Sequence, residues 1–385
     1  MTPRERVVAS LNHREPDRVP VDFGSSHNSS IHFEAYRKLR KHLGIKGEYQ
    51  PEFISFFDQC VRPEKEVLEK LGIDTRGLNY SSPREFKERN WRVNDRAYKE
   101  DAFGIVWEKP DHVGIWNIAQ YPLEDATADE IKNYARFANP EDLGLTEGLR
   151  ERGRKLFEET DYAIVADIQA GSVIEAVWFL TGLARYLMDM ACEPNTIRPL
   201  CDRINEIYKT MSMRMMHELE DYAQIIVANG DLGTQDSLLM SPAQYRKFLK
   251  PYETDFYRHL KRISKVPVIR HSCGSIMEII PDFIECNIDG IHPIQVSAKN
   301  MDTNVLKEKF GNQLVFWGGI DTHKVLPYGS KQDVRDEVRK RIRDLAPEGG
   351  YILGAVHNIQ AEVPPENVCA MFDAAKEFGA YPINC

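Results

Sequence analysis

The sequence lacks the features that address a chain to a membrane or hold it there. No apolar run approaches the roughly 18 residues that cross a bilayer. The chain opens with Met1-Thr-Pro-Arg-Glu, which is not the basic and then apolar pattern of a signal peptide. The net charge of −9 at pH 7 also opposes binding to an anionic lipid surface. We therefore expect a cytoplasmic protein with no membrane partner.

Cysteines are few, and their spacing suggests no disulfide framework. The seven cysteines stand at positions 60, 192, 201, 273, 286, 369 and 385. An odd number of scattered cysteines is typical of a protein in a reducing compartment.

Segregated positive charge is also absent, and with it the usual footprint of a nucleic-acid binder. The basic stretch Arg335–Arg343 is interleaved or flanked by Asp336, Glu337 and Asp344, which is typical of a solvated helix face. With 42% hydrophobic and 28% charged residues, the composition is that of an ordinary globular protein. We expect no nucleic-acid partner.

What the sequence does contain is a rhythm of short apolar runs, which predicts an α/β fold, a (β/α)8 TIM barrel. The runs end in polar residues or glycine and alternate with amphipathic stretches, so each pair predicts a parallel βαβ unit. Six runs, with Val19–Phe23 and a strand near residues 73–79, make eight strands. The absence of a GxGxxG fingerprint favours the barrel over an open doubly wound sheet. The six runs are Ala163–Ile168, Gln224–Asn229, Pro267–His271, Gly290–Ile294, Leu314–Gly318 and Tyr351–Val356.

Residues 1–385 are predicted to form one barrel domain, with residues 31–160 as N-terminal insertions and helices that decorate it. Helices are expected near 32–43 and 63–71, followed by a Trp-, Gly- and Pro-rich section of loops and a small hairpin. Capping signals begin further helices at Thr2, at Ser241 and near Pro364. The stretch Met211–Met216, with Tyr208 before it, is interpreted as helix core.

The residues that end the apolar runs are unusually polar, and in a barrel the active site lies at the carboxyl ends of the strands. We assign catalytic roles to Asp231 and Asp321. Substrate binding is assigned to four further side chains, with ordinary loop capping as the alternative. These four are Asp167, Asn229, Gln235 and Gln295.

His271 and Cys273 form the sharpest feature of the sequence. At the end of an extended run, residues i and i+2 point to the same side, so an imidazole and a thiolate can converge on one ion. His357 closes the last predicted strand and would face them across the barrel. The alternative is a buried structural cysteine beside a hydrogen-bonded histidine. We predict a metal site made of His271, Cys273 and His357.

Several motifs together resemble the uroporphyrinogen decarboxylase superfamily, over roughly residues 160–380. Decarboxylases of that family carry an arginine-rich segment after the first strand, which binds the propionates of the substrate. This chain has Asp22-Phe-Gly-Ser-Ser-His-Asn28 there, with no arginine to pair with many carboxylates. The motifs are Asn229-Gly-Asp-Leu-Gly-Thr-Gln235, Ser241-Pro-Ala-Gln-Tyr245, His271-Ser-Cys-Gly274, Asp289-Gly290, Trp317-Gly-Gly-Ile-Asp321 and Pro364-Pro-Glu-Asn-Val368.

The resemblance therefore points to the other branch of the superfamily, zinc enzymes that move methyl groups to or from corrinoid proteins. It implies Zn²⁺ on His271 and Cys273. It also implies a corrinoid, as methylcobalamin, supplied by a partner protein. That branch includes coenzyme M methyltransferases, whose third ligand is a distant cysteine. Here the position aligns best with His357, a departure from the pattern. One thiolate and two neutral imidazoles leave zinc at a net charge of +1, whereas two thiolates and one imidazole leave it neutral. The more positive zinc is the better Lewis acid for polarising an ether oxygen.

Three hypotheses follow. The leading one is a corrinoid-dependent methyltransferase, such as an O-demethylase component, that acts on a methoxylated compound or a thiol. The second is a metal-free decarboxylase, and the third is a non-catalytic binding or scaffold barrel. Apart from the corrinoid protein, the expected partners are the small methyl donor or acceptor and, as one option, a second copy of the chain in a homodimer.

Overall fold

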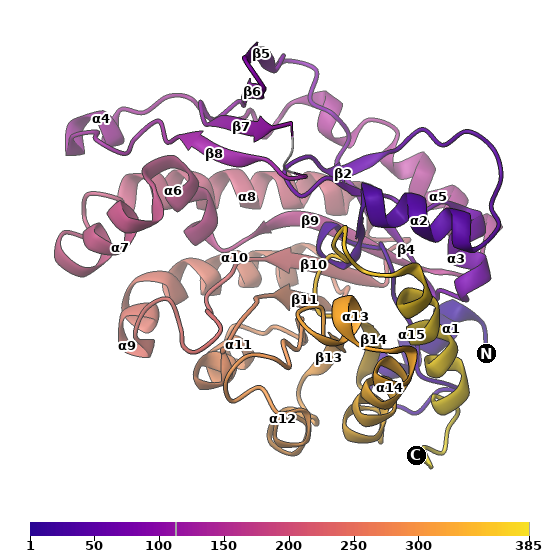
Figure 1. Cartoon of the computed structure of the whole chain (residues 1–385). Coiled ribbons are helices and arrows are strands. Elements are labelled where there is room, and N and C mark those ends of the chain that lie inside the picture. The colour runs from indigo at the N-terminus through magenta and orange to yellow at the C-terminus, as the bar shows by residue number, and fades with distance from the viewer. Residues whose placement is uncertain (112–113, 385) are drawn as a thin grey trace.

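The computed structural model describes residues 1–111 and 114–384 and has a TIM-barrel fold surrounded by helices (Figure 1). Seven parallel strands form one curled sheet, in the order β14-β13-β12-β11-β10-β9-β4. All six predicted runs are strands of this sheet, and the strand expected near residues 73–79 is β4. Their bounds are β4 Thr75–Asn79, β9 Ala163–Gly171, β10 Ile225–Asn229, β11 Val268–His271, β12 Gly290–His292, β13 Val315–Ile320 and β14 Tyr351–Ala355.

The segment at residues 19–23 occupies the eighth position of the barrel, between β14 and β4. Val21 pairs in parallel with Leu353 of β14, and its carbonyl accepts a hydrogen bond from the Asp74 amide at 3.0 Å. We predicted a full strand here, but the segment makes only an isolated bridge. Pro20 has no amide proton, and the Val21 amide donates to the Asp74 side chain at 2.8 Å instead of to a neighbouring strand.

Helix α1, Pro3–Leu11, closes the amino-terminal end of the barrel. Thr2 and Glu5 form the predicted capping box, and Pro3 occupies the first turn. Val7 and Leu11 are buried with inward residues of the strands, including Val165 of β9 and Ile269 of β11. This apolar plug separates the amino-terminal end of the barrel from the opposite end, where the candidate site lies.

The remaining helices of the barrel lie outside the sheet (Figure 1). The helix that Ser241 caps begins at Pro242, passes through one π turn at Tyr245–Leu249 and ends at Ile263, close to the predicted end. No helix in the described ranges is both long and apolar enough to cross a membrane. The bounds are α5 Leu149–Glu159, α6 Val173–Thr181, α7 Leu183–Cys192, α8 Arg198–Leu219, α9 Pro242–Gln244, α10 Lys250–Ile263, α11 Ile280–Glu285, α12 Thr303–Phe310, α13 Val325–Tyr328, α14 Lys331–Leu345 and α15 Pro365–Phe378.

The N-terminal decoration is more ordered than the predicted loops and small hairpin. It contains a four-stranded antiparallel sheet in the order β5-β6-β7-β8, and a small sheet in the order β1-β3-β2. The strands of the larger sheet are half exposed and carry charged residues, so their apolar alternation is weak in the sequence. The bounds are β1 Ile31–His32, α2 Phe33–His42, β2 Phe53–Ser55, β3 Cys60–Val61, α3 Lys65–Leu71, β5 Arg89–Val93, β6 Arg96–Glu100, β7 Val106–Pro110, β8 Asn117–Gln120 and α4 Ala128–Lys132.

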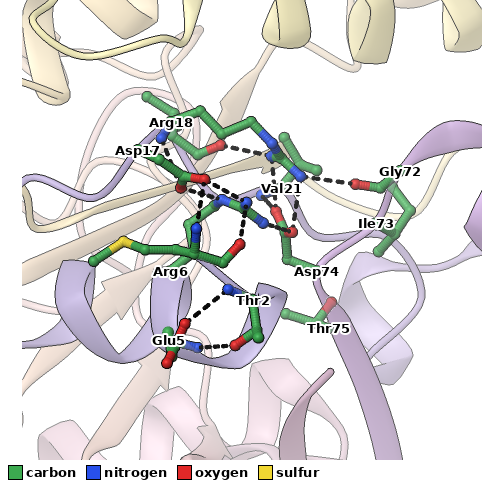
Figure 2. Close-up of polar contacts among 12 residues, drawn as sticks. Thr2, Glu5, Arg6, Asp17, Arg18, Val21, Gly72, Ile73, Asp74 and Thr75 are labelled. Carbon is green, nitrogen blue, oxygen red and sulfur yellow. Dashed lines mark hydrogen bonds and ion pairs between the residues drawn. The ribbon is translucent and has the colours of Figure 1, made fainter. Parts of the chain in front are cut away.

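A cluster of ion pairs joins α1, the 19–23 segment and the start of β4. Figure 2 shows both carboxylate oxygens of Asp74 held by Arg6 and Arg18, with the Val21 amide as a further donor. Arg6 Nη1 lies 2.6 Å from Asp74 Oδ1, and Arg18 Nη2 lies 2.8 Å from the same oxygen. The Asp74 side chain is 1% exposed, whereas that of Asp17, which pairs with Arg6 at 2.7 Å, is 42% exposed. We refer to Arg6, Asp17, Arg18 and Asp74 as the Asp74 cluster.

Candidate metal centre

Three predicted ligands converge at the carboxyl end of the barrel. His271 is the last residue of β11, Cys273 follows two residues later, and His357 lies two residues beyond β14. One ligand atom from each of the three lies within 4.8 Å of the other two. His271 Nε2 and Cys273 Sγ are 3.5 Å apart, and the rings of His271 and His357 lie 5.5 Å apart. We refer to these three residues as the metal triad.

The local backbone explains why the triad forms. The strand end places His271 and Cys273 on one side, as the two-residue period predicts. Gly274 then has a φ of +88°, and a Cβ there would lie 2.4 Å from the Gly233 carbonyl carbon. The chain can therefore turn and pass this close only with glycine at position 274.

His292, at the end of β12, lies within hydrogen-bond distance of the His271 ring. The two Nδ1 atoms are 2.8 Å apart, and His292 is 1% exposed. Burial lowers the pKa of His292 well below its usual value, so the ring is neutral. A His271 ring that offers Nε2 to a metal carries its proton on Nδ1 and donates it to His292 Nδ1.

Asp231 lies directly beside the metal triad, as predicted. Its Oδ1 accepts a hydrogen bond from the Cys273 amide at 2.8 Å and lies 3.4 Å from His271 Nε2. Burial acts to raise the pKa of Asp231, but the hydrogen bond and charge of His271 outweigh burial and lower the pKa to about 2. The carboxylate is ionised at neutral pH.

The donor set fits zinc. Two imidazoles and one thiol are ligands of the kind that Zn²⁺ prefers, and a three-ligand site leaves a fourth position for substrate. Burial, with Asp231, raises the pKa of Cys273 well above its usual value, and burial, with the charge of His271, lowers that of His357 to about 3. The metal-free site thus holds a neutral thiol and a neutral imidazole, and binding of a metal would release the thiol proton.

A cavity of about 480 Å³ is lined by His271 and His357 of the triad, whereas Cys273 is not among its lining residues. Glu175, in the first turn of α6, places its carboxyl group in this cavity, and burial together with Asp231 raises its pKa to about 8. Many of the other residues that line the cavity are aromatic and come from the N-terminal decoration. The lining residues are His27, Asn28, Ile54, Ser55, Phe56, Phe57, Asp58, Asp101, Phe103, Ile105, Trp107, Ala138, Gln169, Glu175, Ala176, Phe179, Ile207, Tyr208, Met211, Asn229, Asp231, His271 and His357.

The other predicted site residues lie at different positions relative to the cavity. Asn229 lines the cavity and accepts a hydrogen bond from Asn28 at 2.7 Å. Asp167 lies behind His27, which lines the cavity, and accepts hydrogen bonds from the backbone amide and Nδ1 of His27, both at 2.9 Å. The charge of Asp167 raises the pKa of His27 although burial acts to lower it, so the two form an ion pair.

Gln235 and Gln295 support the turn after the metal ligands. Gln295 Oε1 accepts from the Gly274 amide at 2.7 Å, and Gln295 Nε2 donates to Gln235 Oε1 at 3.0 Å. Asp321 is outside the cavity lining, and its carboxylate accepts from the His323 amide at 2.8 Å. The structure therefore does not place Asp321 in the cavity lining, and its carboxylate caps the turn that follows β13 instead.

Several residues of the cavity escaped the sequence analysis. His27, Asp58 and Glu175 lie in a short 3-10 helix, a turn and helix α6, and the sequence analysis assigned none of them to the site. The interpretation of this stretch as helix core holds in part: Met215 and Met216 are buried in the core and Tyr208 packs against it, but Tyr208 and Met211 also line the cavity. The Trp- and Phe-rich decoration was a usable signal, because such residues also line ligand pockets.

Comparisons with known proteins agree with this architecture. The family model described as uroporphyrinogen decarboxylase (URO-D) matches residues 154–378. A uroporphyrinogen decarboxylase of Nostoc punctiforme is 24% identical over 192 residues, half of each chain. One of Francisella philomiragia is 26% identical over 141 residues, 35% of this chain and 38% of that protein. The chain thus matches about half the length, or less, of these curated relatives. The structure of a methyltransferase from Methanosarcina mazei superposes with a TM-score of 0.66, at 17% identity, over 98% of this chain and 99% of that one.

Proposed function

The chain belongs to the uroporphyrinogen decarboxylase family, and on that premise we propose that it is a zinc-dependent methyltransferase that exchanges a methyl group between a small substrate and a corrinoid protein. The convergence of His271, Cys273 and His357, two of which line a substrate-sized cavity, carries this proposal. A metal-free decarboxylase would have no use for a thiol and two imidazoles at these distances.

His271 Nε2, Cys273 Sγ and His357 would hold the zinc ion. When bound there, zinc supplies a Lewis acid that stabilises negative charge on the oxygen or sulfur of the substrate. With zinc bound to Nε2, the Nδ1 proton of His271 would be donated to His292 Nδ1, which would orient the ring.

Other residues of the chain would manage protons and water. A methyl group that leaves an ether oxygen leaves its electron pair there, so the product needs a proton. The Glu175 carboxyl group, with a pKa of about 8, holds a proton at neutral pH within the cavity. The ionised Asp231 holds the Cys273 amide in place at the metal triad. The aromatic part of the lining excludes water from the reacting group.

Porphyrinogen decarboxylation fits the cavity poorly. Among the described residues that line it, none is lysine or arginine. The segment at residues 22–28 has buried Asp22, Ser25 and Ser26 where a substrate with many carboxylates would need cations. Carboxylates placed in this cavity would remain unpaired at a large cost in free energy.

Zinc content and methyl transfer, measured together, test the proposal. We expect about one zinc per chain and methyl exchange with a reduced corrinoid protein, followed by the absorbance of methylcobalamin. His271→Ala and Cys273→Ala should lose both and keep the far-UV circular dichroism of the wild type. Cys369→Ala, which changes a free thiol outside the metal triad, is the matched control.

Three results would contradict parts of this proposal. Undiminished methyl transfer in the zinc-free Cys273→Ala variant would exclude the metal mechanism. Formation of coproporphyrinogen from uroporphyrinogen would assign the chain to the decarboxylases. His357→Ala that binds zinc and transfers methyl groups like the wild type would mean that the third ligand lies elsewhere.

A further inference from the structure

A group of aromatic side chains lines the same cavity as His271 and His357. Trp107 on β7 lies at the centre of this group. Its ring centroid is 5.2 Å from that of Phe56, 6.0 Å from that of Phe57 and 5.9 Å from that of Phe179 on α6. Phe103 and Tyr208 line the same cavity. We refer to Phe56, Phe57, Trp107 and Phe179 as the aromatic wall.

The position of Trp107 is fixed by more than packing. Its indole Nε1 donates to Asp101 Oδ2 at 2.9 Å, and the residue is only 5% exposed. Asp101 also accepts from the amides of Phe103 and Ile105, at 2.9 and 3.0 Å. The aromatic wall is therefore preorganised and offers ring surfaces with little conformational entropy left to lose on binding.

The charges around the cavity disfavour an anionic ligand. The charged groups of the lining are the carboxyl groups of Asp58, Asp101, Glu175 and Asp231, and the imidazolium of His27, which Asp167 already neutralises. Lys99 lies behind the wall, with its Nζ 4.1 Å from the centre of the Phe56 ring, and pairs with Glu88 at 3.0 Å. A carboxylate or sulfonate on the substrate would face carboxylates without a cation of its own.

A cationic ligand is less favoured than a neutral one. Aromatic walls do bind quaternary ammonium groups. However, such a nitrogen has no lone pair to offer a metal at the triad. Burial also raises the pKa values of Asp58, Asp101 and Glu175, so the lining carries less negative charge than its four carboxyl groups suggest.

Resting on the proposed methyltransferase function, we propose that the methyl-bearing substrate is an uncharged aryl methyl ether, with its ring against Phe56, Phe57, Trp107 and Phe179 and its ether oxygen toward His271 and His357. The volume of about 480 Å³ suits one substituted ring, within the roughly 300–1,000 Å³ of small-ligand pockets. The N-terminal decoration, which supplies three of the four wall residues, determines this specificity.

Calorimetric binding to the zinc-loaded wild-type chain, without a corrinoid, tests the substrate class. Methoxybenzene should bind about tenfold more tightly than cyclohexyl methyl ether, which has the same ether but no aromatic ring. It should also bind at least about tenfold more tightly than 4-methoxybenzoate, 2-mercaptoethanesulfonate or tetramethylammonium. Tighter binding of any of these four probes than of methoxybenzene would overturn the proposal.

Two variants separate the aromatic wall from general stability. Trp107→Leu and Phe57→Leu should each weaken methoxybenzene binding about tenfold. Trp91→Leu is the matched control and should stay within about twofold, because Trp91 stacks on Tyr98 in the same four-stranded sheet but outside the cavity lining. Since Trp107→Leu removes a hydrogen bond and could disturb the fold, Phe57→Leu decides the question. Unchanged affinity in Phe57→Leu would overturn the assignment of the wall.

Failure of this inference and failure of the proposed function look different. Methyl transfer from a thiol or an alkyl ether, with no binding of methoxybenzene, would keep the methyltransferase and exclude the aryl substrate. Tight, wall-dependent binding of methoxybenzene with no methyl transfer to any corrinoid protein would keep the aromatic ligand and exclude the methyltransferase.

Discussion

The two ends of the barrel carry buried polar clusters of opposite character. In the Asp74 cluster at the amino-terminal end, both oxygens of the buried carboxylate are held by guanidinium groups and an amide (Figure 2). At the carboxyl end, the metal triad brings the ligand atoms of one thiol and two imidazoles within 4.8 Å of one another. A cluster whose groups pair fully stabilises the fold, whereas one whose lone pairs converge on a common point is suited to bind an ion. The predictions below test this contrast.

Asp74→Asn should give the largest change. Removing the buried charge leaves Arg18 without its carboxylate partner and Arg6 with only the exposed Asp17, so we expect the free energy of unfolding to fall by about 3–5 kcal/mol. Urea denaturation measures this change. Asp17→Asn, at the exposed edge of the same cluster, should cost about 1 kcal/mol or less. Equal losses in the two variants would show that burial does not distinguish the two carboxylates.

Glu175→Gln should change the pH dependence of stability. The folded-state pKa of about 8 exceeds the ordinary value of 4.5, so the stability that the neutral carboxyl contributes is present below pH 4.5 and is lost as the pH rises toward 8. We expect the metal-free wild type to lose roughly 3–4 kcal/mol relative to Glu175→Gln between pH 5 and pH 8. Parallel stability curves for the two proteins over this range would be evidence against a buried, protonated carboxyl group.

His292→Phe should weaken zinc binding by about 10–100-fold, because His271 then loses the acceptor that holds its proton on Nδ1. Competition with a chelating dye measures the affinity. His292→Asn keeps an acceptor oxygen and should recover part of the loss. His259→Phe, on helix α10, is a control for changing a histidine outside the site. Zinc affinity that is unchanged in His292→Phe would show that the ligand tautomer does not depend on His292.

Cys273→Ala should have the smallest effect on the fold, although it abolishes zinc binding. In metal-free protein we expect the free energy of unfolding to change by about 1 kcal/mol or less, because the thiol lies at the end of a strand and holds no part of the core together. Urea denaturation in the presence of a chelator measures this. A loss comparable to that of Asp74→Asn would remove the contrast between the two clusters.

The parts of the molecule that the sequence predicted well have a strong local pattern. Apolar runs identified all six strands from β9 to β14, and capping boxes located the starts of α1 and α9. The metal triad was predicted because His271 and Cys273 share one strand end and His357 ends another. Regular periodicity and the common edge of parallel strands are enough for such predictions.

The predictions failed where tertiary contacts override the local pattern. The apolar pattern of residues 19–23 predicts a strand, but Val21 makes only an isolated bridge to Leu353. The Val21 amide donates its hydrogen bond to the Asp74 side chain and not to a neighbouring strand. Asp321 follows a strand end like Asp231 does, yet only Asp231 reaches the metal triad. Glu175 carries no motif and became part of the site because α6 packs beside the triad.

The sequence by itself determined the barrel, the family and the three residues that could bind a metal, because each depends on residue type and on spacing along one or two strands. Only the tertiary structure decided which polar groups share the cavity and which face stabilising partners. It also brought the aromatic wall, whose rings come from the turn after β2, from β7 and from α6, into the same cavity as His271 and His357. Contacts between segments so far apart in the chain depend on packing, and no local pattern of residues encodes them.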